Sequence, residues 1–276
     1  MVISMHITIT GNLGSGKSTI SKIIQEKYGF EIYSTGTIQR NLAKELGKST
    51  LEMNQLMCND PQYDNMIDDA TTRTARENIH KDIIFDSRLA WNFVEKSFKV
   101  FVSVAIDEAA KRVFNDSRGD VEKYTSLEDT KNQLKARAQT ENIRFKDMYD
   151  LEYFNFSNYN LIVDSSYNSS EEIAKIVMDE AKKFYDMVED LGFEDSNKGW
   201  NKILVSPQKL LHEEISKEDE EEVKDLVKEI SKDRKAICKN ILVKDVDGEY
   251  HIIEGKDMVI AAKLIDLSFV EIILTK

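Results

Sequence analysis

Glycine, lysine and serine stand near the start of the chain at a spacing suited to binding phosphate. Residues 11–18 read Gly-Asn-Leu-Gly-Ser-Gly-Lys-Ser. Glycines let the backbone wrap closely around phosphate groups, so that N–H groups and a helix N-terminus can point at them. A lysine at this position reaches the β- and γ-phosphates, and the serine hydroxyl is a ligand for Mg²⁺. The pattern predicts that ATP and Mg²⁺ are bound by Gly11, Gly14, Ser15, Gly16, Lys17, Ser18 and Thr19.

This spacing is the Walker A pattern, which requires a strand before the loop and a helix after it. Residues 5–10 alternate apolar and polar side chains, as a strand does. After the loop, Ile20, Ile23 and Ile24 recur at helical spacing. Both flanks therefore fit, which favours phosphate binding over a plain glycine-rich turn.

Strand and helix patterns alternate along residues 1–191. Such alternation predicts a P-loop NTPase fold, with a parallel sheet between two layers of helices in a three-layer α/β/α arrangement. Ligands of that architecture collect at the carboxyl ends of the strands. We expect strands at residues 5–10, 30–34, 82–86, 99–104 and 160–164.

Two of the predicted strands are followed by polar segments that contain an arginine. Residues 34–40 read Ser-Thr-Gly-Thr-Ile-Gln-Arg, and Ser87 and Arg88 follow the strand that ends at Asp86. Arg40 and Arg88 would face the triphosphate cleft, which suits bidentate binding of a second phosphate group. Asp86 has the position of a Walker B acid, which helps to hold Mg²⁺ or orients the acceptor. For either arginine alone, a surface ion pair is the alternative.

These segments resemble the cytidylate kinases, especially their short archaeal-type branch, over residues 5–190. The resemblance rests on Ser34–Arg40, Asn59–Asp64 with Asp68, Phe85–Ala90, a lid motif of Arg137, Glu141, Arg144 and Phe145, and Asp164-Ser165-Ser166. It implies transfer of the ATP γ-phosphoryl group to a nucleoside monophosphate, with CMP or dCMP as first choice. Catalytic roles are expected for Lys17, Asp86, Arg137 and Arg144, acceptor binding for Ser34, Gly36, Arg40, Asp64 and Arg88, and metal binding for Ser18 and Asp86.

The chain departs from the pattern of this family around the acceptor. Ser87 stands where the family usually has glycine, and Asp86 is one methylene shorter than the usual glutamate. Asn12 and Leu13 replace a proline-containing start of the phosphate loop. Phosphoryl transfer stays the prediction, whereas the identity of the base is left open.

Further arginines could belong to a lid that closes over the donor. A surface ion pair with Glu108, four residues earlier, is the alternative for Arg112. An exposed loop position is the alternative for Arg118. Arg137 and Arg144 lie seven residues apart on a predicted helix, hence on one face, which favours a shared role.

A break in composition at residues 192–199 predicts two domains, residues 1–195 and 198–276. The second shows a β-α-β-β-α-β order and resembles the ParB/sulfiredoxin fold, a small α+β domain. The activities of that fold are not carried over, because Met258 replaces a phosphate-binding arginine and Lys256 replaces a reactive cysteine. We expect a regulatory, oligomerising or substrate-presenting module. Its elements are predicted at residues 203–205, 217–232, 240–244, 249–254, 255–264 and 269–274.

Composition limits the other classes of function. The chain is 41% hydrophobic and 32% charged, as in soluble globular proteins, and no apolar run approaches the roughly 18 residues of a membrane helix. Its net charge of −12 does not favour sequence-independent binding to DNA or RNA. Cys58 and Cys238 match no metal spacing, and a first strand at residue 5 leaves no room for a signal peptide. We therefore expect a cytoplasmic protein with reduced thiols and a small nucleotide substrate.

Two other functions stay open at this stage. The phosphoryl group could pass to another acceptor: a modified nucleotide, a base within DNA, or a small hydroxyl metabolite presented by the second domain. Alternatively, the chain could be a non-enzymatic switch whose ATP state controls a partner. The lid arginines count against a pure switch, because a sensor has little need of a second phosphate pocket.

Overall fold

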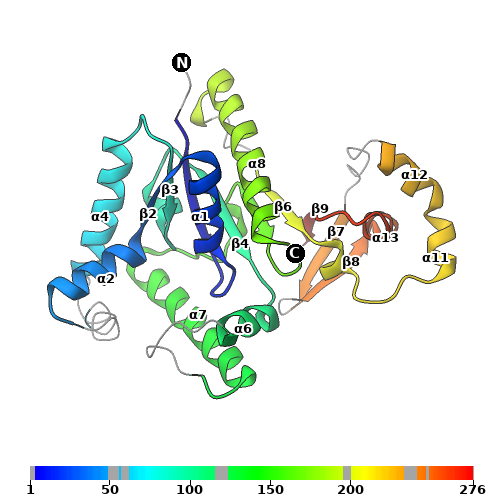
Figure 1. The fold of residues 1–276 in the computed structure, drawn as a ribbon, viewed down its shortest axis with the longest axis horizontal. Helices are drawn as coiled ribbons and strands as arrows, with labels where there is room; N and C mark the ends of the chain where they lie inside the picture. The colour runs from blue at the N-terminus through cyan, green and yellow to red at the C-terminus, as the bar shows by residue number, and fades with distance from the viewer. Residues whose placement is uncertain are drawn as a thin grey trace.

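The computed structural model describes residues 4–48, 56, 62–115, 124–194, 200–232, 241–246 and 249–275, without the side chains of residues 37, 39–42 and 249. Its strands form one nine-stranded sheet in the order β2-β3-β1-β4-β5-β6-β9-β7-β8 (Figure 1). The strands are β1 (His6–Gly11), β2 (Glu31–Ser34), β3 (Ile83–Asp86), β4 (Phe98–Ser103), β5 (Leu161–Asp164), β6 (Lys202–Val205), β7 (Ile241–Val246), β8 (Glu249–Glu254) and β9 (Val270–Thr275).

Strands β1 to β6 all run parallel to one another. This confirms the predicted mixed α/β architecture with a mostly parallel central sheet. Each of the five strands predicted for residues 1–191 lies within one residue of its expected bounds. The helices are α1 (Lys17–Tyr28), α2 (Thr35–Glu45), α4 (Gln62–Glu77), α5 (Ala90–Phe93), α6 (Ile106–Asn115), α7 (Leu127–Tyr149), α8 (Ser170–Leu191), α10 (Pro207–Leu210), α11 (Lys217–Glu222), α12 (Lys224–Lys232) and α13 (Lys256–Leu264).

Helices cover both faces of the parallel part of the sheet (Figure 1). On one face, α1 and α8 pack on apolar side chains of the central strands, among them Ile7, Ile9 and Val100. On the other face, Phe101 and Ile162 pack with residues of α5, α7 and the segment that follows α7. The central strands β1, β4 and β5 are almost fully buried, because they are rich in β-branched and aromatic residues with few charges.

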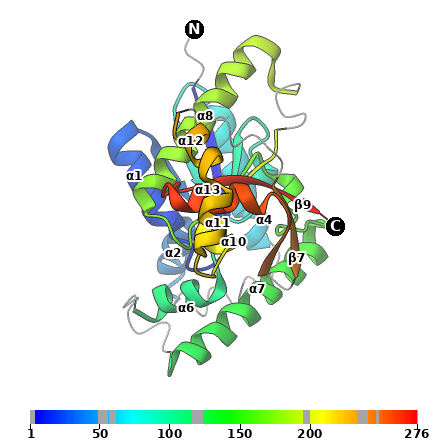
Figure 2. The same ribbon diagram turned by 90° about the vertical axis from the view of Figure 1, so that its right-hand side faces the viewer.

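Residues 200–275 continue the same sheet. Strand β6 pairs in parallel with β5, β9 pairs antiparallel with β6, and β7 pairs in parallel with β9. The predicted β-α-β-β-α-β order is present, although the expected helix over 217–232 is divided into α11 and α12 at Val223. Figure 2 shows α10 to α13 gathered at this end of the molecule. The resemblance to the ParB/sulfiredoxin fold stays a prediction.

One hydrophobic core joins the two parts of the chain. Phe101 and Tyr159 of the kinase-like part share it with Ile241, Val259 and Ala261 of the C-terminal part. Residues 195–199 of the predicted break at 192–199 lie outside the described residues, and the division into two domains stays a prediction. In the part of the chain that the structure describes, no helix has both the length and the apolar character needed to cross a membrane.

Candidate active site

The loop between β1 and α1 can be built only with glycine at two of its positions. Gly11 has a φ of 154°, and a Cβ there would lie 2.1 Å from the carbonyl oxygen of Val102. Gly14 has a φ of 76°, and a Cβ there would lie 2.9 Å from the carbonyl oxygen of Ala109. Helix α1 begins after Gly16, which has no side chain to cap the first N–H groups. The loop therefore suits an anion at the N-terminus of α1.

The predicted phosphate ligands gather at this loop. The Lys17 Nζ folds back and donates hydrogen bonds to the carbonyl oxygens of Gly11 (3.0 Å) and Asn12 (3.1 Å). The Ser18 hydroxyl lies on the exposed side and donates to Asp86 Oδ2 at 3.2 Å. Of the remaining predicted ligands, Ser15 is buried, while Thr19 is exposed in the first turn of α1.

A hydroxyl and a carboxylate oxygen thus converge where β3 ends beside α1. This donor set fits Mg²⁺, which takes oxygen ligands and usually one or two protein groups together with substrate phosphates and water. Ser18 and Asp86 are the residues that would hold it. Among the described residues, no group of three or more histidine, cysteine, aspartate or glutamate side chains could form an all-protein metal site.

Arg88 lies next to this loop with its guanidinium group in an ion-pair network. Its backbone is tied to β1, because the Thr10 hydroxyl donates to the carbonyl oxygens of Ser87 (2.9 Å) and Arg88 (3.3 Å). The Arg88 Nε lies 2.6 Å from Glu141 Oε2, and the Arg137 Nε lies 3.1 Å from Glu141 Oε1. One half-buried carboxylate is therefore held between two guanidinium groups.

Tyr153 completes the surroundings of Arg88. Its hydroxyl accepts a hydrogen bond from Arg88, and its ring stacks with Phe154 at 4.0 Å between centroids. Burial and the Glu141 carboxylate raise the pKa of Tyr153 above its ordinary value, so the phenol stays neutral. The arginine is thus supported by an aromatic residue that the sequence alone did not single out.

A second cluster of charges joins α4 to α7. Arg144 Nη2 lies 3.6 Å from Asp64 Oδ1, and the Tyr149 hydroxyl donates to Asp68 Oδ2 at 2.5 Å. Burial raises the pKa of Asp64, an effect that Arg144 opposes, and burial raises the pKa of Asp68 to about 6. The predicted pair of aspartates four residues apart therefore faces the lid helix.

The two lid arginines lie on one helix, as predicted, but each contacts a different acid. Arg137 pairs with Glu141 and so with Arg88, whereas Arg144 pairs with Asp64 on α4. Arg144 also lies over the ring of Phe145, 5.1 Å from its centroid. Through these contacts, the two arginines and Glu141 hold α7 against Arg88 on one side and against α4 on the other.

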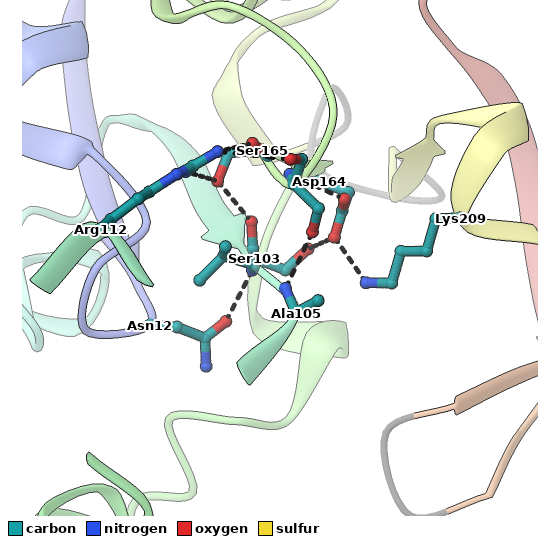
Figure 3. A network of polar contacts seen from close by, with 9 residues as sticks. Asn12, Ser103, Ala105, Arg112, Asp164, Ser165 and Lys209 are labelled. Carbon is teal, nitrogen blue, oxygen red and sulfur yellow. Dashed lines mark hydrogen bonds and ion pairs between the residues drawn. The ribbon is translucent and has the colours of Figure 1, made fainter. Parts of the chain in front are cut away.

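Arg112 of α6 forms the ion pair with Glu108 that was considered for it and also binds the loop after β5, whereas its role in a lid over the donor stays a prediction. Its Nε lies 3.3 Å from Glu108 Oε1, and its Nη2 donates to the carbonyl oxygen of Ser165 at 2.7 Å (Figure 3). Ser165 follows Asp164 at the carboxyl end of β5. Helix α6 is therefore held by a hydrogen bond to the loop that follows β5.

Asp164 is fully buried and is paired with a residue of the C-terminal part. Lys209 Nζ lies 2.5 Å from Asp164 Oδ2, to which the Ser103 hydroxyl also donates at 3.1 Å (Figure 3). Asp164 Oδ1 accepts the N–H of Ser166 at 3.0 Å. Lys209 carried no local signal in the sequence, because its partner lies 45 residues earlier in the chain.

The other predicted residues lie around β2 or outside the described residues. Ser34 ends β2 and pairs in register with Asp86, which brings the two strand ends together. Gly36 lies in the first turn of α2. Arg40 lies in the second turn of α2 rather than directly at the strand end, and its side chain is not among those that the structure describes. Also outside the described residues are Cys58, Asn59, Asp60, Pro61, Arg118 and Cys238.

Comparison with known proteins agrees with this geometry. The sequence profile of the Cytidylate kinase-like family matches residues 6–167. The chain belongs to the cytidylate kinase-like family. It is 31% identical over 182 residues to the cytidylate kinase of Methanocella arvoryzae, which covers 65% of this chain and 99% of that enzyme. It is 33% identical over 186 residues to the cytidylate kinase of Methanoregula boonei, covering 65% of this chain and 97% of that one.

The family likeness supports a nucleotide-kinase activity, and it covers the residues from β1 to the loop after β5. The chain is also 32% identical over 178 residues to an S-adenosylmethionine-dependent nucleotide dehydratase of Lacinutrix mariniflava, but it spans only 36% of that protein. Among solved structures, shikimate kinase from Aquifex aeolicus aligns at 17% identity with a TM-score of 0.42, covering 68% of this chain and 99% of that one.

Proposed function

We propose that this cytidylate kinase-like protein transfers the γ-phosphoryl group of ATP to a nucleoside monophosphate, with CMP or dCMP as the first choice. The observation that carries the proposal is the position of Arg88 and Arg137 around one carboxylate, beside a complete phosphate loop. A second cationic site next to the triphosphate site suits the phosphate of an acceptor. Membership of a kinase family implies ATP as the donor.

The phosphate loop would position the donor. The N–H groups of the loop and the N-terminus of α1 would surround the β- and γ-phosphates, and Lys17 would turn from the loop carbonyls toward them. Mg²⁺, held by Ser18 and Asp86, would neutralise charge on those phosphates. Phosphoryl transfer then depends on placing the acceptor oxygen in line, because positioning and charge stabilisation supply most of the catalysis.

Arg88 would hold the acceptor in place. Glu141 and Tyr153 engage part of its guanidinium, and the remaining N–H groups would bind the acceptor phosphate. Glu141 also fixes Arg137 within reach of the same region, where it would stabilise charge that develops in the transition state. The acceptor would also lie beside α4, where the carboxyl groups of Asp64 and Asp68 could hydrogen-bond to its base or sugar.

A panel of acceptors tests the proposal. The full chain is incubated with ATP, Mg²⁺ and each ribo- and deoxyribonucleoside monophosphate, and ADP formation and product mass are followed. We expect CDP or dCDP to form fastest, and a Lys17→Ala variant to form neither, which excludes a contaminating kinase. ATP binding without turnover of any monophosphate would overturn the proposal and direct attention to another acceptor.

The Arg88→Ala substitution tests the acceptor site by itself. We expect kcat/KM for the acceptor to fall by at least about 100-fold, as for the loss of a donor to a developing charge, while ATP binding is unchanged. The matched control is Arg73→Ala, which removes an exposed arginine of α4. Unchanged turnover in Arg88→Ala would show that the acceptor phosphate is bound elsewhere.

A further inference from the structure

A pocket lies where the C-terminal part of the chain meets the phosphate loop. Its volume of about 500 Å³ falls within the range of small-molecule sites. The kinase-like part and the C-terminal part both contribute to its walls, among them Asn12, Ser103, Phe154, Phe156, Lys209 and Tyr250. Asn12 belongs to the phosphate loop itself, so the pocket opens directly beside the candidate active site.

Part of the pocket wall comes from residues outside the region that the family shares. The family profile ends at residue 167, whereas Lys209, Tyr250 and Leu274 come from α10, β8 and β9. The cytidylate kinase of Methanocella arvoryzae is covered over 99% of its length by an alignment with only 65% of this chain. A site that needs the C-terminal walls is therefore particular to chains with such an extension.

The walls of the pocket combine flat apolar surface with hydrogen-bonding groups. Phe101, Phe154 and Phe156 form a packed aromatic group, with ring centroids of Phe101 and Phe156 5.2 Å apart. Asn12 uses its Oδ1 to accept the N–H of Val104, so its amide N–H₂ is the group that it can offer to a ligand. Burial raises the pKa of Tyr250, which keeps its hydroxyl a neutral donor.

The charges around the pocket exclude a strongly anionic ligand. Lys209 lies 2.5 Å from Asp164, which is fully buried and neutralises it. Asp245 contributes a further carboxyl group to the lining. With its lysine paired to the buried Asp164, the pocket lacks the excess positive charge that a phosphate group requires.

We propose that this pocket binds an uncharged planar heterocycle of the size of a nucleobase or nucleoside. The aromatic walls would stack on its ring, and the Asn12 amide and the Tyr250 hydroxyl would read its polar edge. Base stacking on aromatic side chains tolerates different rings, so the hydrogen bonds would set the preference among them.

The same residues connect the pocket to the lid. Lys209 lines the pocket and holds Asp164, whose other oxygen fixes Ser166, and the neighbouring Ser165 holds Arg112 of α6 (Figure 3). A ligand that shifts Lys209 would therefore act on α6, whose Val113 shares a hydrophobic cluster with Leu134 of the lid helix α7. This effect on turnover rests on the proposed kinase activity, whereas binding to the pocket does not.

Binding is tested on the full chain without ATP or acceptor, so a failure of the proposed activity cannot affect the result. The probes are cytosine, adenine, cytidine, deoxycytidine and adenosine, followed by equilibrium dialysis; the free bases and the nucleosides distinguish the two sources of the ring. We expect saturable binding of at least one probe. Tyr250→Ala and Leu274→Trp, which remove or fill a wall, should weaken it by about tenfold or more.

Two variants serve as controls. Ile253→Ala, an exposed position on β8 outside the pocket, and Arg88→Ala in the acceptor site should leave the affinity unchanged. If Tyr250→Ala does not fold, as judged by its circular dichroism, Tyr250→Phe keeps the ring and tests the hydroxyl. Absence of saturable binding, equal binding by Leu274→Trp, or loss of binding in Arg88→Ala would each overturn the proposal.

Discussion

Asp68 holds a carboxyl group in surroundings that favour its neutral form. Burial raises its pKa to about 6, and the carboxylate of Asp64 on the same helix adds to the effect. The hydrogen bond from Tyr149 opposes these effects without cancelling them. A carboxyl group with a perturbed pKa, in a cluster with Arg144, is typical of a site kept for a ligand rather than for stability.

The Asp68→Asn substitution should make the protein more stable near neutral pH. Because the pKa of Asp68 is raised in the folded state from 3.8 to about 6, the folded protein binds this proton more tightly than the unfolded chain. The resulting stability is fully present below about pH 4 and is lost as the pH rises through about 6. Asparagine keeps an oxygen for Tyr149 and carries no charge. Allowing for partial exposure, we expect a gain of about 1–2 kcal/mol at pH 7 and no gain at pH 4, measured by urea unfolding.

Glu77→Gln is the matched control, because Glu77 is exposed at the end of the same helix and is not among the groups that act on Asp68, so this substitution should change stability by less than about 0.5 kcal/mol. An Asp68→Asn protein that is less stable than the parent at pH 7 would contradict the assignment. In that case, the hydrogen bond from Tyr149 to the carboxylate would stabilise the folded state by more than burial of the charge destabilises it.

The residues that the sequence revealed are those whose partners are local or lie at strand ends. Lys17 and Ser18 belong to a contiguous pattern, and Asp86 ends an apolar strand next in the sheet to β1. The pairing of Glu141 with Arg88 and of Lys209 with Asp164 could not be derived in this way, because 45 residues or more separate the partners. Those contacts depend on how the helices and the C-terminal strands are placed in space.

Among the elements, α8 shows how local signals can define a helix completely. This helix runs over Ser170–Leu191. Ser169 and Glu172 form a capping box at its start, and Gly192 ends it with a φ of 82°. By contrast, the predicted helix over 217–232 is interrupted at Val223, which is 3% exposed in the shared core. Its burial depends on the distant α13, which a local pattern cannot show.

Ser169→Ala should lower the free energy of unfolding by about 1 kcal/mol, because the N–H groups at the start of α8 lose their cap. Helix α8 covers the sheet beside α1, so the loss should be seen as a lower midpoint in urea. Lys175→Ala removes an exposed ion pair with Asp179 on the same helix and should change stability by less than about 0.5 kcal/mol. Equal stability of the two variants would mean that water replaces the cap without cost.

At the scale of the whole molecule, the C-terminal part extends the sheet of the kinase-like part and completes its hydrophobic core. Strand β6 covers the edge of β5, and Ile203, Val243 and Ala261 lie in one cluster with Phe101 and Tyr159. The change in composition near residue 195 is a local property of the sequence. It does not predict that β6, which follows the change, pairs with β5, which precedes it. The family resemblance likewise covered the phosphate loop and the lid but gave no indication of this continuity.

We expect the full chain to unfold in one calorimetric transition. A continuous sheet and a shared core couple the two parts, whereas two independent domains would give two transitions at different temperatures. Differential scanning calorimetry distinguishes these outcomes. It therefore also tests whether the parts on either side of the division predicted at residues 195–198 unfold independently. Two separated transitions would show that the β5–β6 pairing contributes little to either part.

Lys209→Met extends this test to a single contact. The substitution keeps an apolar stem but leaves the Asp164 charge buried without its partner, which costs about 3–5 kcal/mol. If the two parts unfold together, the whole transition should move to lower temperature and stay single, although Lys209 lies in α10 and Asp164 in β5. Lys228→Met removes an exposed pair with Asp225 and should leave the transition in place. A Lys209→Met protein that loses only one of two transitions would show that the pair stabilises one part alone.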